Sequence, residues 1–299
     1  WSSEGMKTVI SNDVTECQSD HLTSFAILLD PSPEHVLPVI HEEILTYITY
    51  IGCAISMVGL ILTIITYSLF KCLHGEKSGK ILLNLCIAML LMNVTFLLGS
   101  QSSSLYGNDI CITVAVFLHL FLLATLMWML VEAVEMYQAL VTVFKKYARF
   151  YMLKRCIAGW GIPILIVSMV LAVDLDHYKP NTDFCFLSQS SPVAYYISLV
   201  GPACLILITN TIVFIMVARV ILKPRFQQQE RGTMTVTPAQ VRGAFTVMIL
   251  LGITWVFGPL AIREAKLVFN YLFCILNSLQ GFMIFVFRCL FNPEARLAW

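Results

Sequence analysis

Seven long apolar stretches constrain this chain more than any other feature. They span residues 44–70, 81–100, 110–140, 152–173, 193–222, 241–262 and 267–289. A helix needs roughly 20 mostly apolar residues to cross the hydrocarbon core of a bilayer, and each stretch reaches that length. Hydrophobic residues make up 58% of the chain and charged residues only 12%, whereas soluble domains carry about 25% charged residues. The sequence therefore predicts an all-α membrane protein, a bundle of seven transmembrane helices.

The positively charged residues are unevenly divided between the two sides of these spans. With seven spans, the segments between them alternate between the two sides of the membrane. Of the 19 lysines and arginines, 15 lie on the same side of the membrane as the carboxy terminus, and only Lys7, Lys179, Arg263 and Lys266 lie on the side of the amino terminus. Because positively charged loops remain cytoplasmic, this bias predicts a multi-pass plasma-membrane protein with an extracellular amino terminus. We expect residues 290–299 to form a short cytoplasmic helix on the membrane surface.

The charge and cysteine patterns argue against several other classes of function. A net charge of +1 provides no basic surface for nucleic acid, and no two of the 10 cysteines have a metal-binding spacing. We therefore expect no nucleic-acid partner, no metal and no cofactor. No cleavable signal sequence precedes the first span, so we expect the chain to begin within a longer precursor.

The predicted topology sorts the cysteines by redox compartment. Cys111 opens the third span, and Cys185 lies midway along the outer loop before the fifth span. Both face the oxidising side of the membrane, where disulfides persist. We predict a Cys111–Cys185 disulfide that ties this loop over the mouth of the bundle.

Several motifs resemble the adhesion G-protein-coupled receptors, and together they cover nearly all of the chain. The stretch from Trp1 to Thr23 resembles the end of a GAIN domain, whose proteolysis site reads His-Leu-Thr, and TSFAILLD (23–30) resembles the tethered agonist that comes after it. The other motifs are WMLVEAVEMY (128–137), GWGIP (159–163), TWVFG (254–258) and LNSLQGFMIFVFRC (276–289). The details resemble group G of this family most, with some features of group D.

The resemblance implies a division of the chain into four parts. Residues 1–22 are expected to be the remnant of the GAIN domain, residues 23–43 the tethered agonist and linker, residues 44–289 the seven-transmembrane domain, and residues 290–299 the short helix. The implied function is a receptor activated by its own agonist segment and signalling through a heterotrimeric G protein. The implied partners are that G protein, the N-terminal GAIN fragment, and membrane lipid or sterol.

The proposed cleavage site consists of His21, Leu22 and Thr23. A threonine hydroxyl can attack the preceding strained carbonyl when a nearby base takes its proton, and histidine is suited to that role. The family usually has cysteines, normally bridged to each other, where this chain has Met6 and Ser19. The absence of both cysteines argues against cleavage, so two alternatives stay open: a single-turnover self-cleavage of the full-length protein at Leu22-Thr23, or activation by unmasking without a cut. We expect no other enzyme activity.

The spacing of apolar residues in the agonist segment fits both an amphipathic helix and an amphipathic strand. Phe25, Leu28 and Leu29 share one face of a helix, whereas Phe25, Ile27 and Leu29 share one face of a strand. Both conformations are compatible with the sequence, and the breaker run 30–33 sets a turn directly behind the segment. The residues expected to act as agonist are Thr23, Ser24, Phe25, Ala26, Ile27, Leu28 and Leu29.

Polar and aromatic residues inside the spans are candidates for the activation machinery. Glu132 matches the family's glutamate that holds the inactive arrangement, although Leu82 stands where its histidine partner often lies. Trp255 and Gly258 match the agonist-sensing region of the sixth span. Asn277 and Gln280 are expected to face the bundle interior in a hydrogen-bonded layer, because amides are costly in lipid.

The inner loops supply the basic residues expected to face a G protein. These residues are Lys145, Lys146, Arg149, Arg219, Lys223 and Arg225. A transporter or channel would need inverted repeats or several charged groups at mid-membrane, and the sequence has neither. A bundle that only anchors an adhesion protein, without signalling, is also compatible with the sequence.

Overall fold

The computed structural model describes most of the helical part of the chain. The described residues are 6–11, 14–19, 39–75, 77–105, 107–141, 150–178, 185–187, 192–221 and 266–299. The chain divides into two units, Trp1–Pro38 and Val39–Trp299. The predicted span 241–262 lies outside the described residues, as do residues 21–29 and the loop residues Lys145, Lys146, Arg149, Lys223 and Arg225.

The N-terminal unit contains a β-hairpin that the sequence analysis did not predict. Strand β1 (Met6–Ser11) pairs antiparallel with β2 (Val14–Ser19). Both strands are rich in β-branched residues, and Asn12 and Asp13, which favour turns, connect them. The register places Met6 opposite Ser19. The two positions where the family usually has bridged cysteines are therefore direct neighbours across the hairpin.

The second unit is a bundle of long helices. Their bounds are α1 (Val39–Leu69), α2 (Lys71–His74), α3 (Lys77–Leu105), α4 (Gly107–Val141), α5 (Tyr151–Cys156), α6 (Ile162–Val173), α7 (Pro192–Tyr195), α8 (Gly201–Ile221), α11 (Lys266–Ser278), α12 (Gln280–Phe285) and α13 (Pro293–Ala298). Five helices are long and apolar enough to span a membrane, and a bent pair, Asn270–Ser278 with Gln280–Leu290, makes a sixth candidate. Six of the seven predicted spans are thus confirmed in the described residues.

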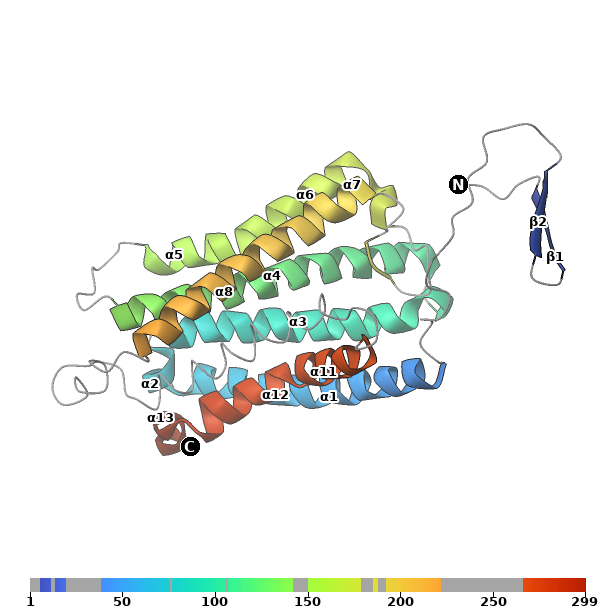
Figure 1. Ribbon diagram of the computed structural model, residues 1–299. Helices are drawn as coiled ribbons and strands as arrows, with labels where there is room; N and C mark the ends of the chain where they lie inside the picture. The colour runs from blue at the N-terminus through green and yellow to red at the C-terminus, as the bar shows by residue number, and fades with distance from the viewer. Residues whose placement is uncertain are drawn as a thin grey trace. The chain divides into compact units, whose positions relative to one another are not determined.

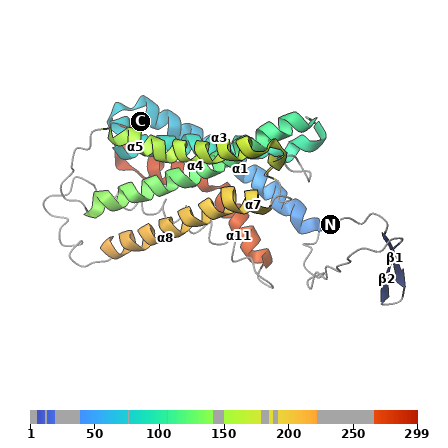
Figure 2. The same ribbon diagram turned by 90° about the horizontal axis from the view of Figure 1, so that it is seen from above.

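The helices pack around α4, which is the central one in the described part of the bundle. It lies against α3 on one side and α8 on another, while α1 packs against α3, α11 and α12 (Figures 1 and 2). The core includes Trp128, Leu82, Leu85 and Met89, all nearly or fully buried. Many large apolar side chains on the outer faces, such as Ile51 and Val58 on α1, are exposed, as expected for helices that face lipid.

Small residues let two of these helix contacts become close. A Cβ atom on Gly159 would collide with the Trp128 indole, and one on Gly59 would lie 2.8 Å from the Cα atom of Phe282. Glycine at these positions allows the helices to approach to backbone distance, which is the usual means of packing in membranes.

Three π-helical turns interrupt the described helices, and a proline comes within three residues after each. The turns are η2 (Ile157–Gly161), η4 (Tyr196–Val200) and η7 (Val286–Leu290), and the prolines are Pro163, Pro202 and Pro293. Proline lacks a backbone N–H and its ring clashes with the carbonyl four residues earlier, so the regular hydrogen-bond ladder cannot continue there. Such turns are frequent at functional sites.

Candidate functional site

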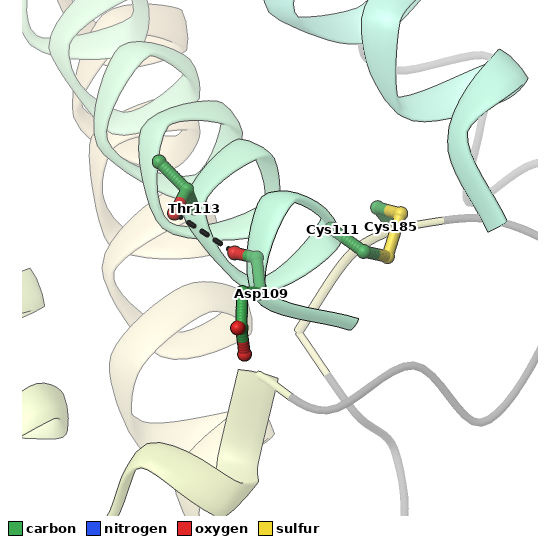
Figure 3. The surroundings of a disulfide bond; sticks show 4 residues. All are labelled: Asp109, Cys111, Thr113 and Cys185. Carbon is green, nitrogen blue, oxygen red and sulfur yellow. Dashed lines mark hydrogen bonds between the residues drawn. A yellow bond between two sulfur atoms is a disulfide. The ribbon is translucent and has the colours of Figure 1, made fainter. Parts of the chain in front are cut away.

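One end of the bundle is closed by a disulfide. Cys111, in the first turns of α4, is bonded to Cys185, and their Cα atoms are 5.2 Å apart (Figure 3). The backbone N–H of Cys185 donates to the carbonyl of Gly99 on α3 at 3.3 Å. This is the cysteine pair that the sequence analysis predicted. The loop segment Cys185–Leu187 is therefore fixed to both α3 and α4 at what we call the disulfide end.

A buried histidine lies about two helical turns further along α4. The Nδ1 atom of His119 is 2.9 Å from the Tyr178 hydroxyl, and its Nε2 atom is 3.1 Å from the Ser198 carbonyl oxygen. A carbonyl only accepts, so Nε2 carries the proton and Nδ1 accepts from Tyr178. Burial raises the pKa of the Tyr178 phenol, which therefore remains a donor. His119 thus joins α4 to the 3-10 turn Leu175–Tyr178 and to the turn η4.

A buried ion pair lies toward the opposite end of α4. Arg288 Nη2 is 3.3 Å from Glu132 Oε1, and the two side chains are only 9% and 7% exposed. The same nitrogen donates to Ser78 Oγ on α3 at 2.9 Å, and the Tyr67 hydroxyl on α1 donates to the Arg288 carbonyl at 3.3 Å. The pair therefore links α1, α3, α4 and the last part of the bent span.

Arg288 was counted in the sequence analysis only as a charge on the inner side. The structure places it inside the bundle, where it takes the role of ionic partner that Leu82, buried and apolar, cannot fill. Glu132 Oε2 and Arg288 Nε have no hydrogen-bond partner among the described residues. The sequence signal for this pair was an arginine within an otherwise apolar span, which in lipid needs a partner.

A second polar cluster joins the end of α4 to the start of α5. Glu135 accepts a hydrogen bond from the Tyr151 hydroxyl and lies 3.5 Å from Arg155 Nη2. The same guanidinium donates to Gln138 Oε1 at 2.9 Å, and it lies over the Tyr151 ring. These contacts hold the end of α4 against the start of α5.

The bent span has its break between the two predicted amide residues. The helix axis turns by 49° between α11 and α12, and the Gly281 N–H donates to Ser56 Oγ on α1 at 2.9 Å. Asn277 and Gln280 thus lie on either side of the break. The Asn277 oxygen and both amide atoms of Gln280 are buried without hydrogen-bond partners in the described part of the chain. Both residues are largely withdrawn from solvent, and the hydrogen-bonded layer expected at this level stays a prediction, because the span 241–262 lies outside the described residues.

Two indoles pack near the middle of the bundle. Trp128 on α4 contacts Trp160 edge to face, with ring centroids 6.3 Å apart, and Trp160 Nε1 donates to Asn84 Oδ1 on α3 at 3.1 Å. Both tryptophans lie in motifs that the sequence analysis singled out. They join α3, α4 and the turn η2 in one contact.

Two protein-family models match this chain. The model described as 7 transmembrane receptor (Secretin family) matches residues 42–284, and the model described as GAIN subdomain B matches residues 1–33. The first match and the candidate spans together make the helical unit a seven-transmembrane receptor domain.

Curated relatives narrow this class. Adhesion G-protein coupled receptor G2 from Rattus norvegicus is 42% identical, and the alignment covers 100% of this chain and 30% of the relative. Adhesion G-protein coupled receptor G4 from Homo sapiens is 41% identical, covering 100% of this chain and 10% of the relative. Adhesion G-protein coupled receptor D1 from Bos taurus is 33% identical, covering 100% and 33%. The chain therefore spans about a third or less of the length of these relatives.

The chain belongs to the adhesion G-protein-coupled receptors, within the secretin family of seven-transmembrane receptors. It is accordingly a multi-pass protein of the plasma membrane. The relation to groups G and D agrees with the resemblance found in the sequence.

Proposed function

We propose that this receptor is activated by its own segment from Thr23 to Leu29 and that it signals through a heterotrimeric G protein. The observation that carries the proposal is the order of the two family matches. The GAIN subdomain match ends at residue 33, and the receptor match begins at residue 42. This order supports the proposal that residues 23–29 act as an agonist segment just before the first span, on the extracellular side.

The linker is long enough for this role. Helix α1 begins at Val39, ten residues after Leu29. An extended chain of that length spans at most about 35 Å, comparable to the thickness of a bilayer. A tethered ligand so close to its site has an effective concentration in the millimolar range, so weak intrinsic affinity is sufficient.

The apolar stripe of the segment provides the binding energy. Burying Phe25, Leu28 and Leu29 contributes about 1.5–3 kcal/mol for each side chain. Shifting a two-state receptor from 1:99 to 99:1 requires about 5.5 kcal/mol of differential binding, which the three residues supply if each contributes about 2 kcal/mol more in the active state. The basic inner loops and Arg219, which lies in the last turn of α8, would then face the G protein.

The proposal is tested by nucleotide exchange on purified G proteins of each subtype. A receptor chain beginning at Thr23 should accelerate exchange on at least one subtype, and a chain beginning at Asp30 should not. A synthetic peptide of residues 23–29 should restore the activity of the shorter chain. If neither chain accelerates exchange on any subtype, the bundle acts as an adhesion anchor and the proposal is wrong.

A further inference from the structure

Pro202 removes one backbone donor from the fifth span near the disulfide end of the bundle. In an α-helix the N–H of residue 202 would bond to the carbonyl of Ser198, but proline has no N–H. The helix is π-helical at this point, from Tyr196 to Val200, and α8 starts directly after it. In this turn the Gly201 N–H bonds to the Tyr196 carbonyl, five residues back, so the regular α-helical pairing is interrupted. Backbone carbonyls at such an interruption within a membrane span depend on donors from the protein, because lipid supplies none.

His119 supplies such a donor from the neighbouring span. Its Nε2 atom lies 3.1 Å from the Ser198 carbonyl oxygen, and both residues are buried. The hydroxyl of Ser198 is occupied separately, because it donates to the Ala194 carbonyl at 2.6 Å. The contact between the two spans is thus made by the backbone of residue 198 and does not depend on its side chain.

Tyr178 fixes the imidazole in the tautomer that this contact needs. Its hydroxyl lies 2.9 Å from Nδ1, and the phenol is fully buried with Leu187, Ala115 and Leu199 in one apolar cluster. Tyr178 comes after the fourth candidate span, and Leu187 lies two residues beyond the disulfide-bonded Cys185. One imidazole therefore connects the third span, the segment after the fourth span and the start of the fifth span.

We propose that His119 is a positioning residue whose Nε2–H bonds to the backbone of the π-helical turn ahead of Pro202 and holds the outer end of the fifth span in the geometry that the agonist segment binds. Its link to the agonist rests on the function proposed above, whereas its effect on the π-helical turn does not. Loss of the bond frees the turn to shift against α4 and changes the mouth of the bundle without touching the ion pair at the opposite end.

Four variants separate this role from general packing. His119→Leu keeps the approximate size and removes both polar contacts. His119→Gln places an amide donor near the position of Nε2, and His119→Asn places one near Nδ1 instead, too short to reach the Ser198 carbonyl. Ser198→Ala is the matched control, because it removes the hydroxyl but keeps the carbonyl that His119 binds.

Hydrogen–deuterium exchange of the purified receptor measures how well the backbone amides of the π-helical turn are protected. We expect the amides of residues 195–201 to exchange at least about 10-fold faster in His119→Leu and His119→Asn, and at wild-type rates in His119→Gln and Ser198→Ala. If His119→Leu does not yield folded receptor, the contrast between Gln and Asn carries the test. Wild-type exchange in His119→Asn, or exchange in His119→Gln as fast as in His119→Asn, would overturn the proposal.

The potency of a peptide of residues 23–29 in the nucleotide-exchange assay measures the effect of His119 on signalling. In the chain beginning at Asp30, His119→Asn should lower the potency of the peptide about 5- to 150-fold, the usual range of coupling between sites, with an unchanged maximal response. His119→Gln should restore the potency. Altered exchange with unaltered potency would refute the link to the agonist. If the unmodified receptor does not respond to the peptide, the function proposed above is wrong. The hydrogen–deuterium exchange rates still test whether His119 stabilises the π-helical turn.

Discussion

Replacing Arg288 by methionine would leave the Glu132 carboxylate buried without its counter-ion. At the observed separation of 3.3 Å, two unit charges attract by about 5 kcal/mol at an effective dielectric constant of 20. Breaking one partner of a buried pair costs about 3–5 kcal/mol in proteins, which agrees with that value. The variant also loses the bond from Arg288 to Ser78. We therefore expect Arg288→Met to be destabilised by about 3–5 kcal/mol.

The double variant Glu132→Leu/Arg288→Met should recover this loss. Replacing both members of a buried ion pair by apolar residues is often neutral or stabilising, because the desolvation of the charges is removed together with their attraction. We expect the double variant to lie within about 1 kcal/mol of the wild type, or above it. Arg296→Met is the control, because it makes the same substitution at an exposed arginine on α13.

Thermal unfolding in detergent measures both variants. Cys53, Cys86 and Cys289 are buried, so a thiol-reactive dye reports their exposure as the bundle unfolds. One kcal/mol corresponds to roughly 2–4 °C for a domain of this size, so Arg288→Met should lower the midpoint by about 6–20 °C at a fixed scan rate. A midpoint equal to that of Arg296→Met, or a double variant as unstable as the single one, would refute the reasoning.

Three further predictions concern other parts of the receptor. Cys111→Ser should destabilise the bundle by up to about 4.5 kcal/mol, from the chain entropy of the loop of 74 residues that the disulfide closes, and the thermal midpoint should fall accordingly. Phe25→Ala or Leu28→Ala, in a chain beginning at Thr23, should each reduce nucleotide exchange by about 10-fold or more, and unchanged exchange would contradict the agonist stripe. Full-length protein should give two bands on a denaturing gel and a Thr23→Ala variant one band. Single bands from both would show that His21 and Thr23 do not support cleavage.

The positions of the spans were predictable because hydropathy is a local property of the chain. Each of the six described spans could be located from its own 20 or so residues, within a few positions of the observed bounds. The Cys111–Cys185 pair was predictable for a related reason, since the topology left few cysteines on the oxidising side. The hairpin at residues 6–19 was not predicted, although its β-branched residues and the Asn12-Asp13 connection were visible signals.

The sequence by itself determined which segments enter the membrane and the family to which the receptor belongs, because both depend on the order and composition of residues along the chain. Only the tertiary structure decided which buried polar groups meet. Glu132 and Arg288 are 156 residues apart and His119 and Ser198 are 79 apart, and each pairing depends on how the helices are rotated about their axes and on where a proline interrupts them. Periodicity predicts that such groups need partners, but the choice of partner is made by packing, since a helix rotated by one residue, about 100°, would present a different side chain to its neighbour.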